Sequence, residues 1–261
     1  MDDDQEKSYA TPKLTQSIGD IDFRNTNLPL GGLNPHNKHF DIIGAQITNL
    51  IIQHTNINRN SRVLEIGCGT GRICKQLLKC INHKKYVGID VNEKYIQYCD
   101  DSYKATFKHV DINNKEFNKD GKIEQSQFTI PYDDNSFDII YSIAVFNHCD
   151  QPCVMKYIQE ISRLLRHNGM LFGTIILLNS SSIASINKRD KHPFKFQLRT
   201  EQTWYEYKDR PLWNVAFKEQ MIRRQLVQNK MMIIDPIRYG EWCGSKAAIT
   251  GHDVIIASKG R

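Results

Sequence analysis

Short apolar runs alternate along this chain with segments in which apolar residues recur every three or four positions. The apolar runs occupy residues 63–66, 86–91, 106–112, 137–146 and 170–178. The segments with the helical repeat occupy residues 41–51, 73–81, 154–165 and 217–226. Short apolar runs suit buried strands, and a repeat of three to four places one apolar stripe on a helix. Strands alternating with helices predict an α/β fold, with a doubly wound and mostly parallel sheet.

The C-terminal part of the chain predicts a change of strand direction. Two further apolar runs, residues 231–237 and 252–257, have no helical repeat between them, which is typical of an antiparallel hairpin. They bring the sheet to seven strands, with an antiparallel C-terminal hairpin strand at the edge. Residues 1–30 are polar, so we expect an N-terminal arm, able to fold over the active site, ahead of a single domain of residues 31–261.

Residues 179–230 depart from this regular pattern. They contain eleven Lys and Arg against five Asp and Glu, and this balance of 11 − 5 = +6 equals the net charge of the whole chain. Aromatic residues are interleaved with the basic ones between residues 183 and 216. We expect a basic, aromatic insertion that forms the acceptor side of the site.

Composition favours a cytoplasmic protein. The longest apolar run has nine residues, which is too short to cross a bilayer, and the acidic, polar N-terminus is unlike a secretory signal. The seven cysteines are scattered and form no C-x-x-C pair. The sequence therefore predicts reduced thiols, and neither a disulfide framework nor a metal site.

The candidate chemistry begins with a glycine-rich turn after the first predicted strand. Residues 65–71 read Glu-Ile-Gly-Cys-Gly-Thr-Gly. Glycines permit positive φ angles and let a ligand lie against the bare backbone. Arg72 stands where a dinucleotide loop needs its third glycine, and no P-loop Gly-Lys-Ser/Thr follows. Glu65 would repel a pyrophosphate and attract a sulfonium or ammonium group, which favours S-adenosylmethionine over NAD. The alternative is a glycine turn of structural use only.

Two carboxylates end the next two predicted strands. Asp90 lies 23 residues after Gly67, much the spacing at which nucleotide-binding folds place the acid that binds the ribose hydroxyls. Its alternative role is to cap the helix that begins at residue 92 or 93. Asp111 ends the third strand, where its carboxylate could hold an adenine amino group.

In this order, the motifs resemble those of class I S-adenosylmethionine-dependent methyltransferases. The similar segments, all within residues 40–178, are 65–71, 88–90, 110–111, 131–138 and 160–169. The resemblance implies a Rossmann-like fold that binds S-adenosyl-L-methionine, releases S-adenosyl-L-homocysteine and needs no metal. It implies a cofactor site of Glu65, Gly67, Cys68, Gly69 and Gly71 at the methionine part, Asp90 at the ribose, Asp111 and Ile112 at the adenine, and Val91 and Ile143 completing the set.

Two departures from the family pattern concern turns. His167, Asn168 and Gly169 stand where the family has Pro-Gly-Gly, and we expect Gly169 to end the preceding helix. The loop after the fourth strand lacks the Asn/Asp-Pro-Pro-Tyr of many amino methyltransferases, which argues against an adenine or glutamine nitrogen as the acceptor.

A looser similarity concerns the acceptor side. Residues 142–148, 240–244 and 251–255 resemble bacterial-type methyltransferases that act on sugars or surface glycans. A hydroxyl acceptor gains from a general base, and His148 is our candidate, with Asp150 as its orienting partner or as the alternative base. The alternative is a His148 that lines the site without proton transfer. Three aromatic residues either shape the acceptor pocket or form local core: Trp204, Tyr205 and Trp242.

The sequence therefore predicts methyl transfer to a hydroxyl of a small molecule, sugar or glycan. One alternative is an RNA methyltransferase that binds tRNA through residues 183–230. Another is a cofactor-binding protein without catalysis that acts through a partner. The aromatic surface also leaves a homodimer open.

Overall fold

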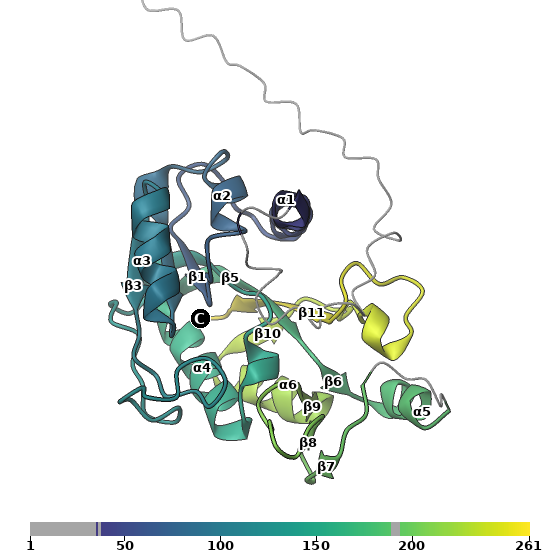
Figure 1. The fold of residues 1–261 in the computed structure, drawn as a ribbon. Helices are drawn as coiled ribbons and strands as arrows, with labels where there is room; N and C mark the ends of the chain where they lie inside the picture. Colours follow the sequence, from purple (N-terminus) through teal and green to yellow (C-terminus); the bar gives the residue numbers. More distant parts are fainter. Residues whose placement is uncertain (1–34, 36–37, 189–193) are drawn as a thin grey trace, which may run out of the picture.

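The computed structural model describes residue 35, residues 38–188 and residues 194–261. A seven-stranded sheet lies at the centre of these residues, with helices on both of its faces (Figure 1). The expected arm, residues 1–30, lies outside the described residues.

The central sheet has the strand order β10-β11-β5-β4-β1-β2-β3. Its strands are β1 (Val63–Ile66), β2 (Tyr86–Asp90), β3 (Thr106–His109), β4 (Phe137–Ser142), β5 (Leu165–Ile175), β10 (Met231–Ile233) and β11 (Asp253–Lys259). β1 to β5 are parallel, and β11 is antiparallel to both of its neighbours, β5 and β10. This confirms the doubly wound, mostly parallel sheet with an antiparallel C-terminal strand. Because the strand order reverses between β1 and β4, the carboxyl ends of these strands border the crevice where such sheets bind ligands.

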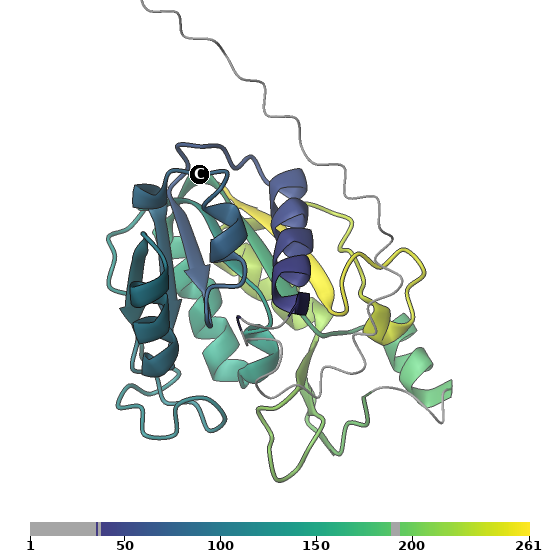
Figure 2. The same ribbon diagram turned by 45° about the horizontal axis from the view of Figure 1, so that its top comes forward.

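Helices cover both faces of the sheet because its side chains alternate between two apolar clusters. The helices are α1 (Lys38–His54), α2 (Cys74–Leu77), α3 (Glu93–Ser102), α4 (Gln151–Leu164), α5 (Ser180–Lys188) and α6 (Glu219–Gln228). Val63 and Tyr141 pack with residues of α1, α2 and α3, whereas Leu64 and Ile140 pack with residues of α4 and α6 (Figure 2). None of the helices in the described part of the chain is long and apolar enough to span a membrane.

Besides β3, which ends at His109 instead of residue 112, and β10, which ends at Ile233 instead of residue 237, three expected boundaries were wrong. The helix expected over residues 73–81 has a single α-helical turn, Cys74–Leu77, within a series of turns. β4 ends at Ser142 instead of residue 146, because the chain turns at Ala144 (φ 55°) into a 3-10 turn, η5 (Phe146–His148).

The third boundary concerns the end of α4. Gly169 is not the residue that ends this helix, because α4 stops at Leu164 and β5 begins at the next residue. Leu165 is fully buried and pairs with Phe137, so core packing starts the strand there. Asn168 takes the positive φ of 61°, and the next pairing joins Met170 to Ile139 across an irregularity.

The insertion forms a small sheet of its own, which the sequence pattern did not predict. Its order is β6 (Leu177–Leu178), β9 (Val215–Lys218), β8 (Thr203–Tyr205) and β7 (Leu198–Arg199). Trp204 and Trp242 are buried in a third apolar cluster together with Phe196. These two tryptophans therefore form a local core between part of the insertion and residues that follow it, while Tyr205 packs partly buried against the main core.

A buried ion pair fixes the segment that leads into β4. Glu160 on α4 accepts from Lys156 (3.2 Å), from Arg163 (2.8 Å) and from the N–H of Ile130 (2.9 Å). Arg163 also donates to the carbonyls of Ile130 and Tyr132, each at 2.8 Å. Burial of Glu160 opposes ionisation, but these donors outweigh it and lower its pKa. The pair ties residues 130–134 to α4.

We expect Arg163→Ala to lower the free energy of unfolding by about 2–4 kcal/mol, since it leaves the buried Glu160 without its main partner. Urea unfolding followed by circular dichroism measures this change. Arg166→Ala is the matched control, because Arg166 lies two residues beyond α4 and pairs with Asp138 in an exposed position. It should cost less than about 1 kcal/mol. Equal losses in the two variants would refute the role of the buried pair.

Candidate functional site

The glycine turn between β1 and α2 has the conformation that the sequence predicted. Gly67, Gly69 and Gly71 have φ angles of 76°, 52° and 80°. At Gly67 a Cβ atom would lie 2.3 Å from Cγ2 of Val145, so the turn and the loop after β4 approach too closely for a side chain. The N–H of Gly67 donates to the carbonyl of Ile89 (2.8 Å), which fixes the turn against the end of β2.

Asp90 joins this turn to the next helix. Its Oδ2 accepts from the N–H of Gly69 and its Oδ1 from the N–H of Asn92, both at 2.8 Å. Burial raises the pKa of Asp90, although these N–H groups favour the charged form. The expected alternative role, capping α3, belongs to the Asn92 side chain, which accepts from the N–H of Lys94. Each Asp90 oxygen keeps a further lone pair for a ligand hydroxyl.

Glu65 lies beneath the turn, in the interior. Tyr141 donates its hydroxyl to Glu65 at 2.8 Å, and the hydroxyl of Tyr86 donates to the same oxygen. Burial raises the pKa of Glu65 to about 8, against the effects of these donors and of the Arg72 charge. Glu65 therefore links β1 to β2 and β4 through these two hydrogen bonds.

The other expected cofactor residues gather around the same edge of the sheet. Oδ1 of Asp111 accepts from Nδ2 of Asn118 (3.0 Å), and this hydrogen bond lowers the pKa of Asp111. Ile112 and Cys68 are buried, and Val91 and Ile143 are partly buried. Since β1, β2, β3 and β4 are adjacent and parallel, the structure brings the carboxyl ends of all four strands together.

His148 lies on η5, and both of its ring nitrogens are engaged. Nδ1 lies 3.1 Å from the carbonyl oxygen of Leu212, which requires a proton on Nδ1. Nε2 therefore accepts from Nδ2 of Asn147, also at 3.1 Å. Burial lowers the pKa of His148 to about 4, so the ring is neutral near pH 7. Asp150, the expected orienting partner, instead caps α4 by accepting from the N–H of Cys153 (3.0 Å).

A polar chain that the sequence did not reveal leads from His148 into the insertion. Nδ2 of Asn147 also contacts Oδ1 of Asn214 (3.3 Å), and Nδ2 of Asn214 donates to the buried Glu206 (2.6 Å). Oδ1 of Asn147 is buried and has no hydrogen-bond partner among the described residues. Asn147 was within reach of sequence analysis, because it adjoins His148. Asn214 was not, because a residue 67 positions further along the chain gives no spacing signal.

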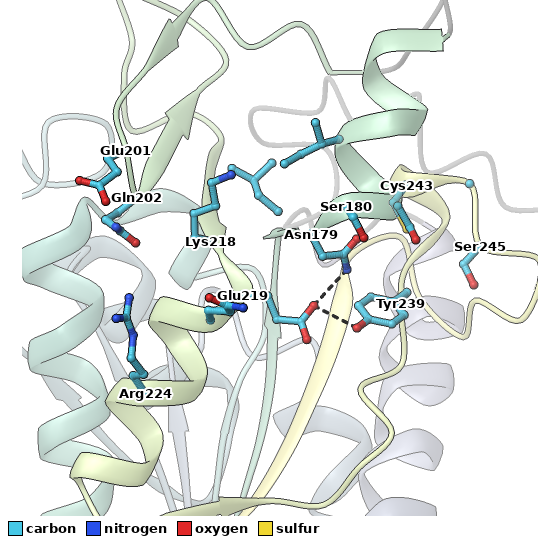
Figure 3. Close-up of a pocket in the computed structure, with 15 residues that line it drawn as sticks. Asn179, Ser180, Glu201, Gln202, Lys218, Glu219, Arg224, Tyr239, Cys243 and Ser245 are labelled. Carbon is cyan, nitrogen blue, oxygen red and sulfur yellow. Dashed lines mark hydrogen bonds between the residues drawn. The ribbon is translucent and has the colours of Figure 1, made fainter.

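A cavity of ≈ 1130 Å³ lies apart from these polar side chains, between the start of α5, the β9–α6 junction and η6 (Glu241–Cys243). Most of the residues that line it carry hydroxyl, amide or charged groups. Glu219 accepts from Asn179 and Tyr239, both at 3.0 Å (Figure 3). β9 connects the two places, since it begins beside Asn214 and ends at Lys218 in the cavity wall, about 10 Å further on.

Comparison with known proteins agrees with this geometry. Residues 63–169, which carry the glycine turn, Asp90, Asp111 and His148, match the family model described as a methyltransferase domain. These residues therefore carry a methyltransferase domain, and the comparisons support the class I S-adenosylmethionine-dependent methyltransferase superfamily. Within the described residues, no group of three or more His, Cys, Asp and Glu could hold a metal ion.

The similar proteins are distant. A putative methyltransferase, 235L, of Invertebrate iridescent virus 6 is 24% identical over 62% of this chain and 54% of its own length. The chain therefore spans about half the length of that relative. An S-adenosylmethionine-dependent methyltransferase from Methanosarcina mazei has a TM-score of 0.54 and 18% identity over 81% of this chain and 97% of its own.

A second solved structure is the complex between the Haloferax volcanii Trm112 methyltransferase activator and a putative methyltransferase. Its matching chain has a TM-score of 0.56 and 12% identity, over 86% of this chain and 93% of that one. At these identities, the two solved structures support the methyltransferase fold.

Buried acids and histidines make the stability of this protein depend on pH. Burial raises the pKa of Asp253 to about 7 while its oxygens accept from the N–H groups of Leu177 and Gly240, both at 2.7 Å. Burial also lowers the pKa of His252 to about 4, and the charge of His148 adds to this shift. Folding therefore favours the protonated forms of Asp253 and Glu65. It favours the neutral, unprotonated forms of His148 and His252.

We expect the free energy of unfolding to fall by about 1–2 kcal/mol between pH 6.5 and pH 8. The raised acids lose stability from about pH 4 up to their folded pKa values of about 7 and 8. The histidines gain stability from about pH 4 through their unfolded pKa of about 6.5, so their gain offsets part of this loss and fades above that pH. Urea unfolding at half-unit pH intervals measures the curve.

Glu65→Gln tests the assignment, because it removes the acid with the higher pKa. The fall should then end near pH 7, with its size reduced to less than about 1 kcal/mol. An unchanged fall up to pH 8 would show that Glu65 is not the titrating group.

Proposed function

We propose that this protein transfers the methyl group of S-adenosyl-L-methionine to a hydroxyl of a small molecule, sugar or glycan. The observation that carries the proposal is the glycine turn bound to Asp90 at the carboxyl ends of β1 and β2, within the residues that match the methyltransferase family.

The residues at this edge fit the cofactor. Free lone pairs on Asp90 suit the ribose hydroxyls, and the glycine backbone lets the methionine part lie close. Asp111 suits the adenine amino group, with Ile112, Val91 and Ile143 as its apolar surroundings. The bound cofactor supplies an electrophilic methyl group on a sulfonium.

The protein contributes mainly position to such a transfer, because nucleophile, methyl carbon and sulfur must lie in line. We propose that His148 lines the acceptor side as a neutral ring, since Asn147 occupies Nε2, the nitrogen that would take a proton. Accepting a proton there requires the Asn147 amide to turn away. Asp150 would then serve His148 indirectly, by fixing the start of α4 next to η5.

Two features support a hydroxylated acceptor. The buried, unpartnered oxygen of Asn147 suits a ligand group that donates a hydrogen bond. The cavity at the far end of β9 is lined mainly by residues with amide, hydroxyl or charged side chains, which suit a polar molecule.

The basic residues of the insertion support tRNA less well. Arg210 pairs with Glu116, and Arg223 pairs with Glu219 and Asp235. Cations engaged within the protein are not available to phosphates. A homodimer is a further proposal. So is a non-catalytic role through a partner, which the solved complex with a methyltransferase activator supports only by likeness of fold.

We expect S-adenosylhomocysteine to bind the wild-type protein and Asp90→Asn to weaken this binding about 10- to 100-fold, because a charge-assisted contact is worth about 1.5–3 kcal/mol. Isothermal calorimetry with both cofactor forms measures the affinities. Asp100→Asn is the control, since Asp100 is an exposed acid on α3, and it should bind like wild type. Folded wild-type protein that binds neither form would overturn the proposal.

Acceptor assays with methyl-labelled cofactor then separate the alternatives. Label should pass to a pool of saccharides or small hydroxylated compounds. Transfer to tRNA that weakens with salt would favour the RNA alternative, and binding without transfer to any pool would favour the non-catalytic one.

A further inference from the structure

Three consecutive residues of the loop between β3 and β4 contact three separate parts of the site. Glu116 accepts from Arg210 of the insertion, at 2.9 Å from Nε and 2.6 Å from Nη2. The centroids of the Phe117 and His148 rings lie 4.8 Å apart, and the ring planes meet at 64°. Asn118 donates to Asp111. We call residues 116–118 the bridge.

The bridge is held as one unit. Asn114 and Asn118 exchange two backbone hydrogen bonds of 2.8 Å across the turn that presents these residues. Nδ2 of Asn118 also donates to the carbonyl of Ile112 (3.1 Å), and Nδ2 of Asn114 donates to the carbonyl of His148 (3.0 Å). A shift at Asn118 therefore moves Glu116 and Phe117 with it.

On the insertion side, the same contacts close into a ring. The guanidinium of Arg210 lies 3.9 Å from the centre of the Trp213 ring, and Trp213 lies 6.1 Å from the ring of His148. His148 in turn donates to the carbonyl of Leu212. The path runs from Glu116 through Arg210 and Trp213 to His148, and back through Phe117.

We propose that the bridge couples the two halves of the site, with Glu116 and Asn118 as positioning residues: cofactor at Asp111 orders the bridge, which sets His148 and Trp213 for the acceptor. This inference rests on the proposed function. Asn118 and the N–H of Lys122 bind the Asp111 carboxylate, which retains lone pairs for an adenine amino group. An adenine there adds a third partner to the group that anchors Asn118.

Such coupling is reciprocal, so loosening the contacts on the insertion side must weaken the binding of the cofactor. Glu116 is the buried partner, with 7% of its side chain exposed, while 52% of Arg210 is exposed. An ion pair so close to solvent contributes little by itself, and its value here lies in fixing Arg210 against Trp213.

Hydrogen exchange of peptides covering residues 206–214, with and without saturating S-adenosylhomocysteine, tests the coupling. We expect the cofactor to slow exchange there at least threefold in the wild type. Asn118→Ala, saturated with the same ligand, should lose this protection while remaining folded by circular dichroism. Arg210→Gln should weaken S-adenosylhomocysteine about 5- to 20-fold, although Arg210 belongs to the insertion.

A matched control and a rescue separate coupling from general damage. Arg199 also stacks on a tryptophan of the insertion, 4.1 Å from the Trp204 ring, but lies outside the bridge. Arg199→Gln should leave the affinity within twofold of wild type. Arg210→Lys, which keeps the charge facing Glu116, should recover part of the loss seen in Arg210→Gln.

The outcomes distinguish the two proposals. If S-adenosylhomocysteine binds but exchange at residues 206–214 does not change, the bridge does not couple the halves, and the proposed function stands. Equal effects of Arg210→Gln and Arg199→Gln would also overturn the inference. If the folded wild type binds no S-adenosylhomocysteine, the proposed function fails and the inference fails with it.

Discussion

The carboxylate of Asp90 is the contact on which the candidate site depends. It holds the N–H of Gly69 and the N–H of Asn92, and so fixes the glycine turn to the start of α3. The three glycines adopt positive φ angles without steric cost but have many other conformations open to them, so such an anchor is needed to hold the turn in one conformation. The buried Glu65 supports the turn from below, through the tyrosines of β2 and β4. The site is thus preformed by the sheet itself.

The proposed acceptor side is built differently, by segments that are distant in sequence. The loop after β3, the turn after β4 and the insertion meet at His148, which contacts Phe117, Asn147 and Leu212. None of these segments forms the edge alone. Specific contacts between side chains therefore determine its shape, whereas the cofactor edge follows from strand order.

The sequence predicted most of the fold, and the half of the site that depends on local patterns. Apolar periodicity located the strands, and the motif around Gly67 correctly implied positive φ angles. The sequence pattern misplaced the end of α4, because burial of Leu165 outweighs the tendency of Gly169 to end a helix. The ring around His148 was out of reach, because Glu116 and Arg210 lie 94 positions apart and an ion pair leaves no periodic signal. The roles of the cofactor and acceptor residues stay predictions.

The two sides of the small sheet differ in how freely they can change during evolution. Trp204 and Trp242 pack with Phe196 in a third cluster, whereas Val215 and Phe217 of β9 belong to the same core cluster as Leu64 of β1. Substitutions around the two tryptophans therefore leave the contacts of β1 intact, whereas replacement of β9 would remove part of the main core. Any exchange of residues 206–214 would also have to keep a counterpart to Arg210, since Glu116 would otherwise be a nearly buried charge without its cationic partner.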